Sequence, residues 1–157
     1  MLPLLPHAFA GLSEDFHTRQ NWEGFDHPFV VIENTDLKNE LGINNFGGQE
    51  LLNVFNGTEK MESLKPLSMV YSGHQFGQYV EQLGDGRGLL LGQMSSDDGL
   101  TDVHLKGAGK TPYSRFGDGR AVLRSVIREY LCGEAMHALS IPTSRALMIV
   151  GSDEMVI

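Results

Sequence analysis

A lysine at the end of a predicted strand precedes a glutamate inside a predicted helix, and this order constrains the fold more than any other feature of the sequence. Residues 103–106 read Val-His-Leu-Lys, and such alternation of apolar and polar side chains is typical of a strand with one face in a core. Val103 and Leu105 are therefore expected to face the core. His104 and Lys106 are expected to point to the opposite, polar side of the strand.

The helix that follows this lysine is predicted over residues 120–139. At about 100° per residue, its apolar side chains share one face. They are Val122, Leu123, Val126, Ile127, Tyr130 and Leu131. Glu129 falls at the edge of this face, so its carboxylate is expected to reach inward. Asp118 is expected to be the N-cap of the helix.

The rest of the chain predicts short strands and helices without an internal repeat or an interdomain linker. Strands are expected at residues 28–32, 67–71, 88–94 and 100–106. The first is expected to be buried, and the last two should form a hairpin, because the loop at 95–99 ends in Asp-Gly. Short helices are expected at 35–41, with Gly42 as the stop, and at 50–55. Residues 71–77 are predicted to form a polar turn.

Length and composition limit the classes of protein that this chain can represent. Its 157 residues can build one domain with a sizeable core, and 41% hydrophobic residues without a long apolar run indicate a globular chain with no membrane span. The 20 acidic and 12 basic residues give a formal net charge of −8, which argues against general binding to nucleic acid or to an anionic membrane.

The single cysteine and the N-terminus bear on the compartment. Cys132 excludes an intrachain disulfide and a cysteine-rich zinc site, fits a reducing compartment, and is expected to serve in packing. The first ten residues lack the charged region and the apolar core of a signal peptide. We therefore expect the protein to be cytoplasmic.

Two glycine-containing segments do not match familiar nucleotide motifs. Residues 109–111 read Gly-Lys-Thr, but His104 stands where a P-loop needs its first glycine. Residues 84–88 precede a strand rather than a helix, and Leu89 occupies the third glycine position of a dinucleotide fingerprint. Two interpretations of 84–88 are left. It is a plain β-turn, or a loop whose N–H groups and Arg87 lie along a polyphosphate.

Residues 117–120 and the pair of Lys106 and Glu129 each allow a functional and a structural interpretation. The segment reads Gly-Asp-Gly-Arg and is expected at the start of the long helix, where free N–H groups favour an anion. The alternative is a capped helix with a solvated arginine. Lys106 and Glu129 can form an ion pair that holds the ammonium at nucleotide phosphates, as in the small lobe of a protein kinase. The alternative is a surface lysine and a solvated glutamate.

Several long strings of this sequence resemble the selenoprotein O family, also known as the YdiU family, from about His7 to the C-terminus. The densest are 71–77 (Tyr-Ser-Gly-His-Gln-Phe-Gly), 82–87 (Gln-Leu-Gly-Asp-Gly-Arg), 105–109 (Leu-Lys-Gly-Ala-Gly) and 111–115 (Thr-Pro-Tyr-Ser-Arg). Further matching strings are 117–125, 127–131 and 141–143. Their common order makes an accidental likeness a poor explanation.

This resemblance implies a protein-kinase-like fold that transfers AMP, rather than a phosphoryl group, from ATP to hydroxyl side chains of other proteins. It also implies a flipped ATP, with the γ-phosphate buried and the α-phosphate presented to the hydroxyl. The positions that match the family's nucleotide-binding residues are Gly84, Gly86, Arg87, Lys106, Asp118 and Gly119. Glu129 matches the glutamate that pairs with the lysine. The family's catalytic aspartate and magnesium ligands are expected downstream of Ile157, so none is assigned here.

We therefore expect an α+β fold, a fragment like a kinase small lobe, with a mainly antiparallel sheet and one prominent helix. Residues 1–66 are predicted to form an N-terminal extension and 67–157 a nucleotide-binding lobe. The catalytic lobe is expected to be absent from this chain, so the chain alone is expected to be inactive. The implied cofactors are ATP and Mg²⁺, and the implied partners are proteins with hydroxyl side chains, not nucleic acid or membrane. The alternatives are a noncatalytic, pseudokinase-like interaction domain and an ordinary protein phosphotransferase.

Overall fold

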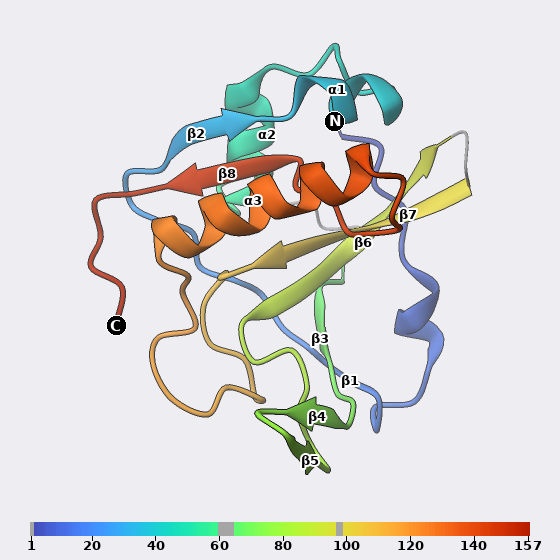
Figure 1. Cartoon of the computed structure of the whole chain (residues 1–157), viewed down its shortest axis with the longest axis vertical. Coiled ribbons are helices and arrows are strands. Elements are labelled where there is room, and N and C mark those ends of the chain that lie inside the picture. The colour runs from blue at the N-terminus through green and yellow to red at the C-terminus, as the bar shows by residue number, and fades with distance from the viewer. Residues whose placement is uncertain (1, 60–64, 97–98) are drawn as a thin grey trace.

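The strands of this chain pair antiparallel throughout the described residues. The computed structural model describes residues 2–59, 65–96 and 99–157. There, a four-stranded sheet has the order β1-β3-β6-β7, and β2-β8 and β4-β5 form two-stranded sheets. The strands are β1 (His17–Arg19), β2 (Phe29–Glu33), β3 (Leu67–Met69), β4 (Gly73–Gln75), β5 (Gln78–Val80), β6 (Gly88–Ser96), β7 (Gly99–Lys106) and β8 (Met148–Gly151). The expected α+β fold with mainly antiparallel pairing is confirmed (Figure 1).

The short helices form where the sequence supplies caps and stops. The helices are the 3-10 helix η1 (Ala8–Gly11), α1 (Thr35–Glu40), α2 (Gly48–Phe55) and α3 (Leu123–Ala138). Asn34 caps α1 by accepting a hydrogen bond from the N–H of Leu37 at 3.0 Å, and Gly42 follows the helix with φ +66°. The helices predicted at 35–41 and 50–55 are therefore confirmed.

The long hairpin of β6 and β7 carries the predicted lysine. Gly88 pairs with Lys106 at its open end. Val103 and Leu105 are half-buried, whereas His104 and Lys106 are exposed. The predicted hairpin and the two faces of its second strand are confirmed.

A β-bulge interrupts the pairing of this hairpin. The register shifts by one residue between Leu90 and Gly92 of β6, which makes Leu91 the extra residue. In a regular strand, residues five apart point to opposite faces. Here Leu89 and Met94 are both only 1% exposed and lie opposite residues on one face of β7. The bulge therefore lets both side chains enter the core.

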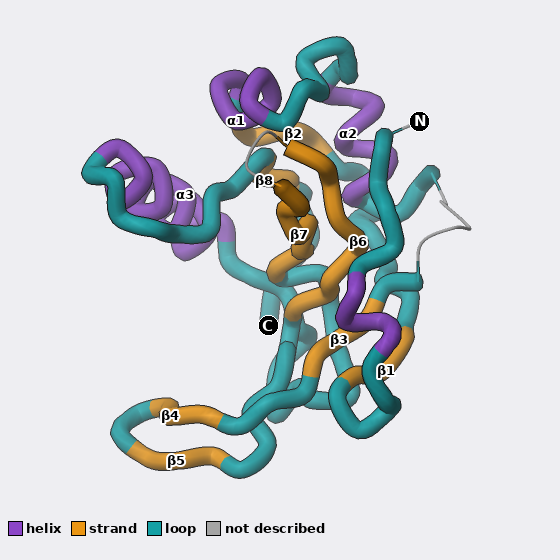
Figure 2. Tube along the Cα trace, turned by 90° about the vertical axis from the view of Figure 1, so that its right-hand side faces the viewer, coloured by secondary structure: helices purple, strands orange, loops and turns teal. Residues whose placement is uncertain are grey.

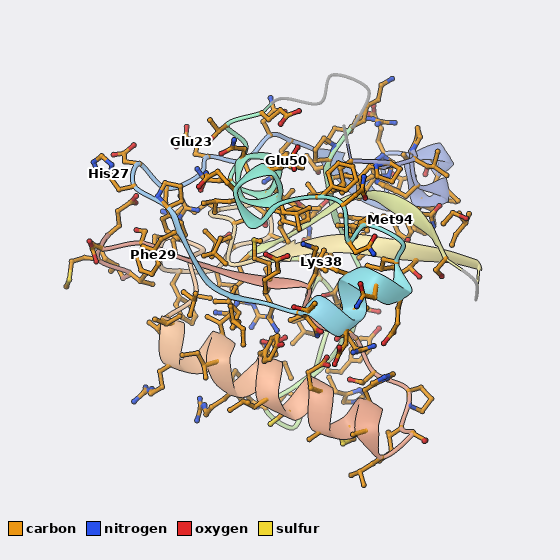
Figure 3. The ribbon with its side chains drawn as sticks, turned by 90° about the horizontal axis from the view of Figure 1, so that it is seen from above. Glu23, His27, Phe29, Lys38, Glu50 and Met94 are labelled. Atoms are coloured by element: carbon orange, nitrogen blue, oxygen red, sulfur yellow. The ribbon has the colours of Figure 1, made fainter. Side chains whose placement is uncertain are left out.

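The main hydrophobic cluster joins the N-terminal segment, α2 and β6. Its buried members are Leu2, Leu4, Ile43, Leu51, Val54 and Met94. Leu5 also bridges to Gln93 on β6, with N–H to carbonyl distances of 2.8 Å in both directions. Figure 3 shows Met94 inside the molecule and Glu23 projecting at its edge. Residues from both sides of the boundary expected at 66/67 share this core, and the boundary itself stays a prediction.

Two predictions about β structure need correction. Residues 71–77 are not a single turn, because β4 pairs with β5 and only Phe76 and Gly77, with φ of 53° and 77°, make the bend between them. β2 forms where a strand was predicted, but none of its residues is buried, since it pairs with β8 in a two-stranded sheet. The tip of the loop predicted at 95–99, Asp97 and Asp98, lies outside the described residues.

The long helix starts later than the sequence predicts. α3 begins at Leu123, and its N-cap is Val122 rather than Asp118. Gly117 and Gly119 have φ of 76° and 72°, which keeps the backbone before the helix out of the right-handed region. The predicted N-terminus at Arg120 is therefore wrong.

α3 also leaves much of its apolar face uncovered. It lies on one side of β8, with α1 and α2 at the end of the molecule opposite the β4–β5 hairpin (Figures 1 and 2). No residue of α3 is buried. Leu123, Ile127 and Leu131 are 42%, 38% and 60% exposed, and only Val126 and Tyr130 of the predicted face turn partly inward. Because Cys132 is exposed too, its predicted packing role is wrong.

Candidate functional site

The lysine at the end of β7 and the glutamate of α3 form a direct ion pair. Lys106 Nζ lies 2.6 Å from Glu129 Oε1 and 2.7 Å from Oε2. The two side chains are 45% and 52% exposed. An exposed pair of this kind contributes only about 0–1 kcal/mol to folding. The pairing predicted from the sequence is present, and its exposure leaves the ammonium open to a further anionic partner.

The glycine loop before β6 is packed so closely that side chains are excluded from it. Gly84 has φ +61°, and a Cβ there would lie 2.7 Å from Cγ of Tyr113. A Cβ at Gly86 would lie 3.2 Å from the carbonyl oxygen of Tyr113. The hydroxyl of Thr111 donates to the carbonyl of Asp85 at 2.6 Å, and that of Ser114 donates to the carbonyl of Gly86. Residues 111–114 therefore brace this loop from behind.

Arg87 joins the glycine loop to the lysine strand. Its side chain is exposed. Its carbonyl accepts a hydrogen bond from the N–H of Gly107 at 2.8 Å, and the next residue, Gly88, pairs with Lys106. Arg87 and Lys106 thus belong to the two chain segments whose backbones meet at the open end of the hairpin, and both side chains are exposed. Cationic side chains at one end of a hairpin suit a ligand with several anionic groups.

Asp85 in the middle of the loop has a structural environment. Its carboxylate accepts hydrogen bonds from the N–H of Met69 at 3.0 Å and from the Tyr71 hydroxyl at 3.2 Å, and it lies 3.5 Å from Nε2 of His104. Burial alone would raise the pKa of Asp85, but its hydrogen bonds with His104, Met69 and Tyr71 outweigh burial and lower it. An ionised carboxylate therefore ties the loop to β3 and β7.

Asp118 and Gly119 lie beside the segment that follows the lysine, not on a helix end. Asp118 accepts hydrogen bonds from the N–H groups of Ile157 and Arg120, both at 2.8 Å, and these bonds lower its pKa. Gly119 has φ +72°, and a Cβ there would come within 2.2 Å of Gly109. Because α3 begins only at Leu123, the anion site expected from helix-end amides at 117–120 is not formed.

A pocket of about 530 Å³ opens next to this second loop. Among the predicted site residues it is lined by Asp118, together with Gly109 and Arg120 and the aromatic residues Trp22 and Phe25. The guanidinium of Arg120 lies 4.5 Å from the Phe25 ring centroid. Lys106, Glu129 and the glycine loop are not part of its lining. The predicted residues thus fall into two groups, which the backbone of 107–109 connects.

The sequence did not single out the residues that brace the glycine loop. Thr111, Tyr113 and Ser114 contact it directly, yet they were noted only in a string resembling a family and, for Thr111, in a segment that does not match a P-loop. Their signal was a proline-containing turn after a strand, with hydroxyl groups on both sides. Spacing alone does not reveal that a turn packs on a loop more than twenty residues away.

Comparison with known proteins identifies the family. A model described as protein adenylyltransferase SelO matches residues 5–157. A protein of Vibrio parahaemolyticus named protein nucleotidyltransferase YdiU is 51% identical over 148 residues, which cover 94% of this chain and 30% of that protein. Proteins of the same name from Vibrio atlanticus and Dechloromonas aromatica are 57% and 47% identical and are covered to 30% and 31% of their length.

These matches extend over nearly the whole chain, and it belongs to the SelO family. The resemblance predicted from its strings of residues is confirmed. The chain spans 30–31% of the length of the relatives compared. Most residues of a full-length relative therefore have no counterpart in this chain.

Two kinds of feature are absent from the described part of the chain, a cluster of metal-ligand side chains and a membrane-spanning helix. Residues 2–59, 65–96 and 99–157 contain no group of three or more His, Cys, Asp or Glu side chains that could hold a metal ion. Within the same ranges no helix has both the length and the apolarity needed to cross a bilayer.

Proposed function

We propose that this chain is the nucleotide-binding part of a protein adenylyltransferase with a kinase-like fold. The complete enzyme would move AMP from ATP to Ser, Thr or Tyr hydroxyls of other proteins. The observation that carries the proposal is the Lys106–Glu129 pair, whose ammonium stands at the open end of the β6–β7 hairpin. Family membership supports the same reading.

The first group of residues fits a triphosphate. Gly84 and Gly86 lack side chains where Tyr113 packs on the loop, and this packing fixes the path of the backbone that leads to Arg87. Arg87 offers a planar fork of donors, and Lys106 offers a point charge fixed by Glu129. Asp118 and Gly119 are proposed as a second contact with the nucleotide, reached through the turn at 107–109.

In the proposed reaction the oxygen of a protein hydroxyl attacks the α-phosphorus of ATP. The new bond joins that oxygen to the α-phosphorus, and the bond to the bridging oxygen of the β-phosphate breaks. Pyrophosphate leaves, and the hydroxyl proton passes to a base. Arg87 and Lys106 would stabilise the charge that develops on the leaving pyrophosphate. A flipped ATP, with its γ-phosphate inward, brings the α-phosphate to the acceptor.

Magnesium has no fitting ligand set among the described residues, so no step is assigned to it here. The base and any metal ligands are proposed to come from the part of the full-length protein that this chain does not span. We also propose a cytoplasmic location, consistent with the single exposed cysteine.

Two measurements test the proposal. Titration calorimetry of the 157-residue chain should show ATP binding, which Glu129→Gln and Lys106→Ala weaken. Incubation with α-labelled ATP and a protein acceptor should label that acceptor when a full-length relative is used, but not when this chain is used alone. Robust magnesium-dependent labelling by the homogeneous 157-residue chain would contradict the assignment of the base and metal ligands elsewhere.

The position of the label separates the alternatives. AMP transfer delivers the α-phosphate to the acceptor, whereas an ordinary phosphotransferase delivers the γ-phosphate. A full-length relative that binds ATP but transfers neither label would instead support a pseudokinase-like interaction domain.

A further inference from the structure

Ion pairs join α3 to the rest of the chain in addition to its packing against β8. No residue of this helix is buried. Apart from the pair between Glu129 and Lys106, the strong polar ties of α3 run from Glu134 to Arg145. A helix with an uncovered apolar face and little buried area gains little stability from packing. Charged side chains therefore act together with the partly buried Val126 and Tyr130 in fixing where this helix lies.

The guanidinium of Arg145 joins α3 to α1. Its Nε lies 3.0 Å from Glu134 Oε1 and its Nη2 2.8 Å from Oε2, a two-point contact. Its Nη1 lies 2.6 Å from Oε2 of Glu40, the last residue of α1. The Arg145 side chain is only 10% exposed. The hydrogen bonds from Arg145 lower the pKa of Glu134, so this carboxylate is held in its charged form.

The backbone around Arg145 is anchored independently of α3. The side chain of Asn34, the N-cap of α1, donates to the carbonyl of Ala146 at 3.2 Å, and the N–H of Asn34 donates to Leu147 at 2.8 Å. The chain then enters β8, which pairs with β2. Arg145 therefore reaches α3 from a fixed support made of α1, β2 and β8.

The two carboxylates that hold α3 belong to one rigid element. Glu129 and Glu134 are separated by about 7.5 Å along the helix axis, at 1.5 Å per residue. A Cβ at Gly133 would lie 3.1 Å from the carbonyl oxygen of Ser144, so the helix closely approaches the backbone just before Arg145. A shift or rotation of α3 about Glu134 would carry Glu129 away from Lys106.

We propose that Arg145 is a positioning residue, which through Glu134 holds α3 where Glu129 meets Lys106. The significance of this for nucleotide binding rests on the proposed function, whereas its effect on the ion pair does not. Nothing about Arg145 requires contact with the nucleotide. Loss of Arg145 should release Lys106 even though the two residues do not touch.

The test measures the Lys106 amine directly. Acetic anhydride must reach the Lys106 nitrogen, and a carboxylate held against Nζ restricts that approach. Breaking the pair should therefore speed acylation at Lys106, which peptide mass spectrometry follows. Glu129→Gln sets the full effect, which we expect to be about two- to fivefold for an exposed pair. Arg145→Met should give most of that increase and Arg145→Lys part of it. Acylation of Lys110 in the same samples serves as the internal reference.

Two further variants keep the outcome decisive. Glu134→Gln breaks the same tie from the helix side and leaves Arg145 paired with Glu40, so it serves if Arg145→Met does not fold. Arg19→Met removes an exposed arginine that donates to the carbonyl of Ala10 at 2.9 Å. Arg19 lies in β1, at the opposite edge of the four-stranded sheet from β7, so this change should leave Lys106 unaffected. The proposal is overturned if Glu134→Gln and Arg145→Met react like the wild type while Glu129→Gln reacts faster. An equal increase in Arg19→Met overturns it as well.

ATP affinity tests the proposed function separately from the role of Arg145. If the wild type binds ATP, Arg145→Met should weaken binding about as much as Glu129→Gln does, with helix content by circular dichroism unchanged. If the wild type binds no ATP, the proposed function fails, and the acylation rates alone decide the role of Arg145.

Discussion

Replacing Lys106 by alanine should separate ligand binding from folding. The side chain is 45% exposed and its partner Glu129 is 52% exposed, so loss of the pair should change the free energy of unfolding by about 0–1 kcal/mol. A hydrogen bond to a charged group contributes about 1.5–3 kcal/mol when its partner has no substitute. At about 1.4 kcal/mol per tenfold change in Kd, ATP binding should weaken about 10- to 100-fold.

The assay pairs titration calorimetry with thermal unfolding on the same protein samples. Lys65→Ala is the matched control, because Lys65 is an exposed lysine just before β3 and does not line the pocket beside Asp118. The control should keep both the Kd and the Tm of the wild type. Unchanged ATP affinity in a well-folded Lys106→Ala protein would remove the lysine from the site. A large fall in Tm would show instead that this end of β7 is structural.

Three further outcomes follow from close packing and charge. In chemical denaturation, Gly84→Ala should lower the free energy of unfolding by more than Gly42→Ala does. Both glycines have positive φ, which alone costs about 1–2 kcal/mol for alanine, but only at Gly84 would the new Cβ also clash with Tyr113. Equal losses in the two variants would contradict that contact. Asp85→Asn should flatten the acid side of a plot of unfolding free energy against pH. The lowered pKa of Asp85 gives stability that is present above its unfolded pKa of 3.8 and is lost as the pH falls through the folded value. An unaltered acid side of the plot would refute this. Met94→Ala should reduce stability by about 2–5 kcal/mol in the same denaturation assay, whereas Met155→Ala, at an 89% exposed position, should change it by less than about 0.5 kcal/mol.

The sequence predicted the parts of the fold that depend on local alternation and on caps. The β6–β7 hairpin, the sidedness of Lys106 and the helix that follows Asn34 all rest on neighbours within a few residues. The pair of Lys106 and Glu129 was also predictable, because strand alternation and helix periodicity each fix a direction. Its membership of a nucleotide site stays a prediction.

The errors arose where distant segments decide the local structure. Asp118 has the right chemistry for an N-cap, but Gly117 and Gly119 adopt positive φ and delay the helix, while the Asp118 carboxylate binds Ile157 and Arg120 instead. Helix periodicity indicated which face of α3 is apolar but not how much of it the chain covers. Burial of that face depends on tertiary neighbours, which periodicity does not specify.

The extra residue at Leu91 allows β6 to carry one residue more than the segment of β7 that it pairs with, without a change in which side chains face the core. If Leu91 were removed, Leu89 and Met94 would be four residues apart, and a regular strand would still place both on one face. The same deletion would remove a side chain that is only 1% exposed, together with the local bend that a bulge gives to a strand. At this one position β6 can therefore lose a residue without turning its core face outward, and what it loses is the packing of Leu91.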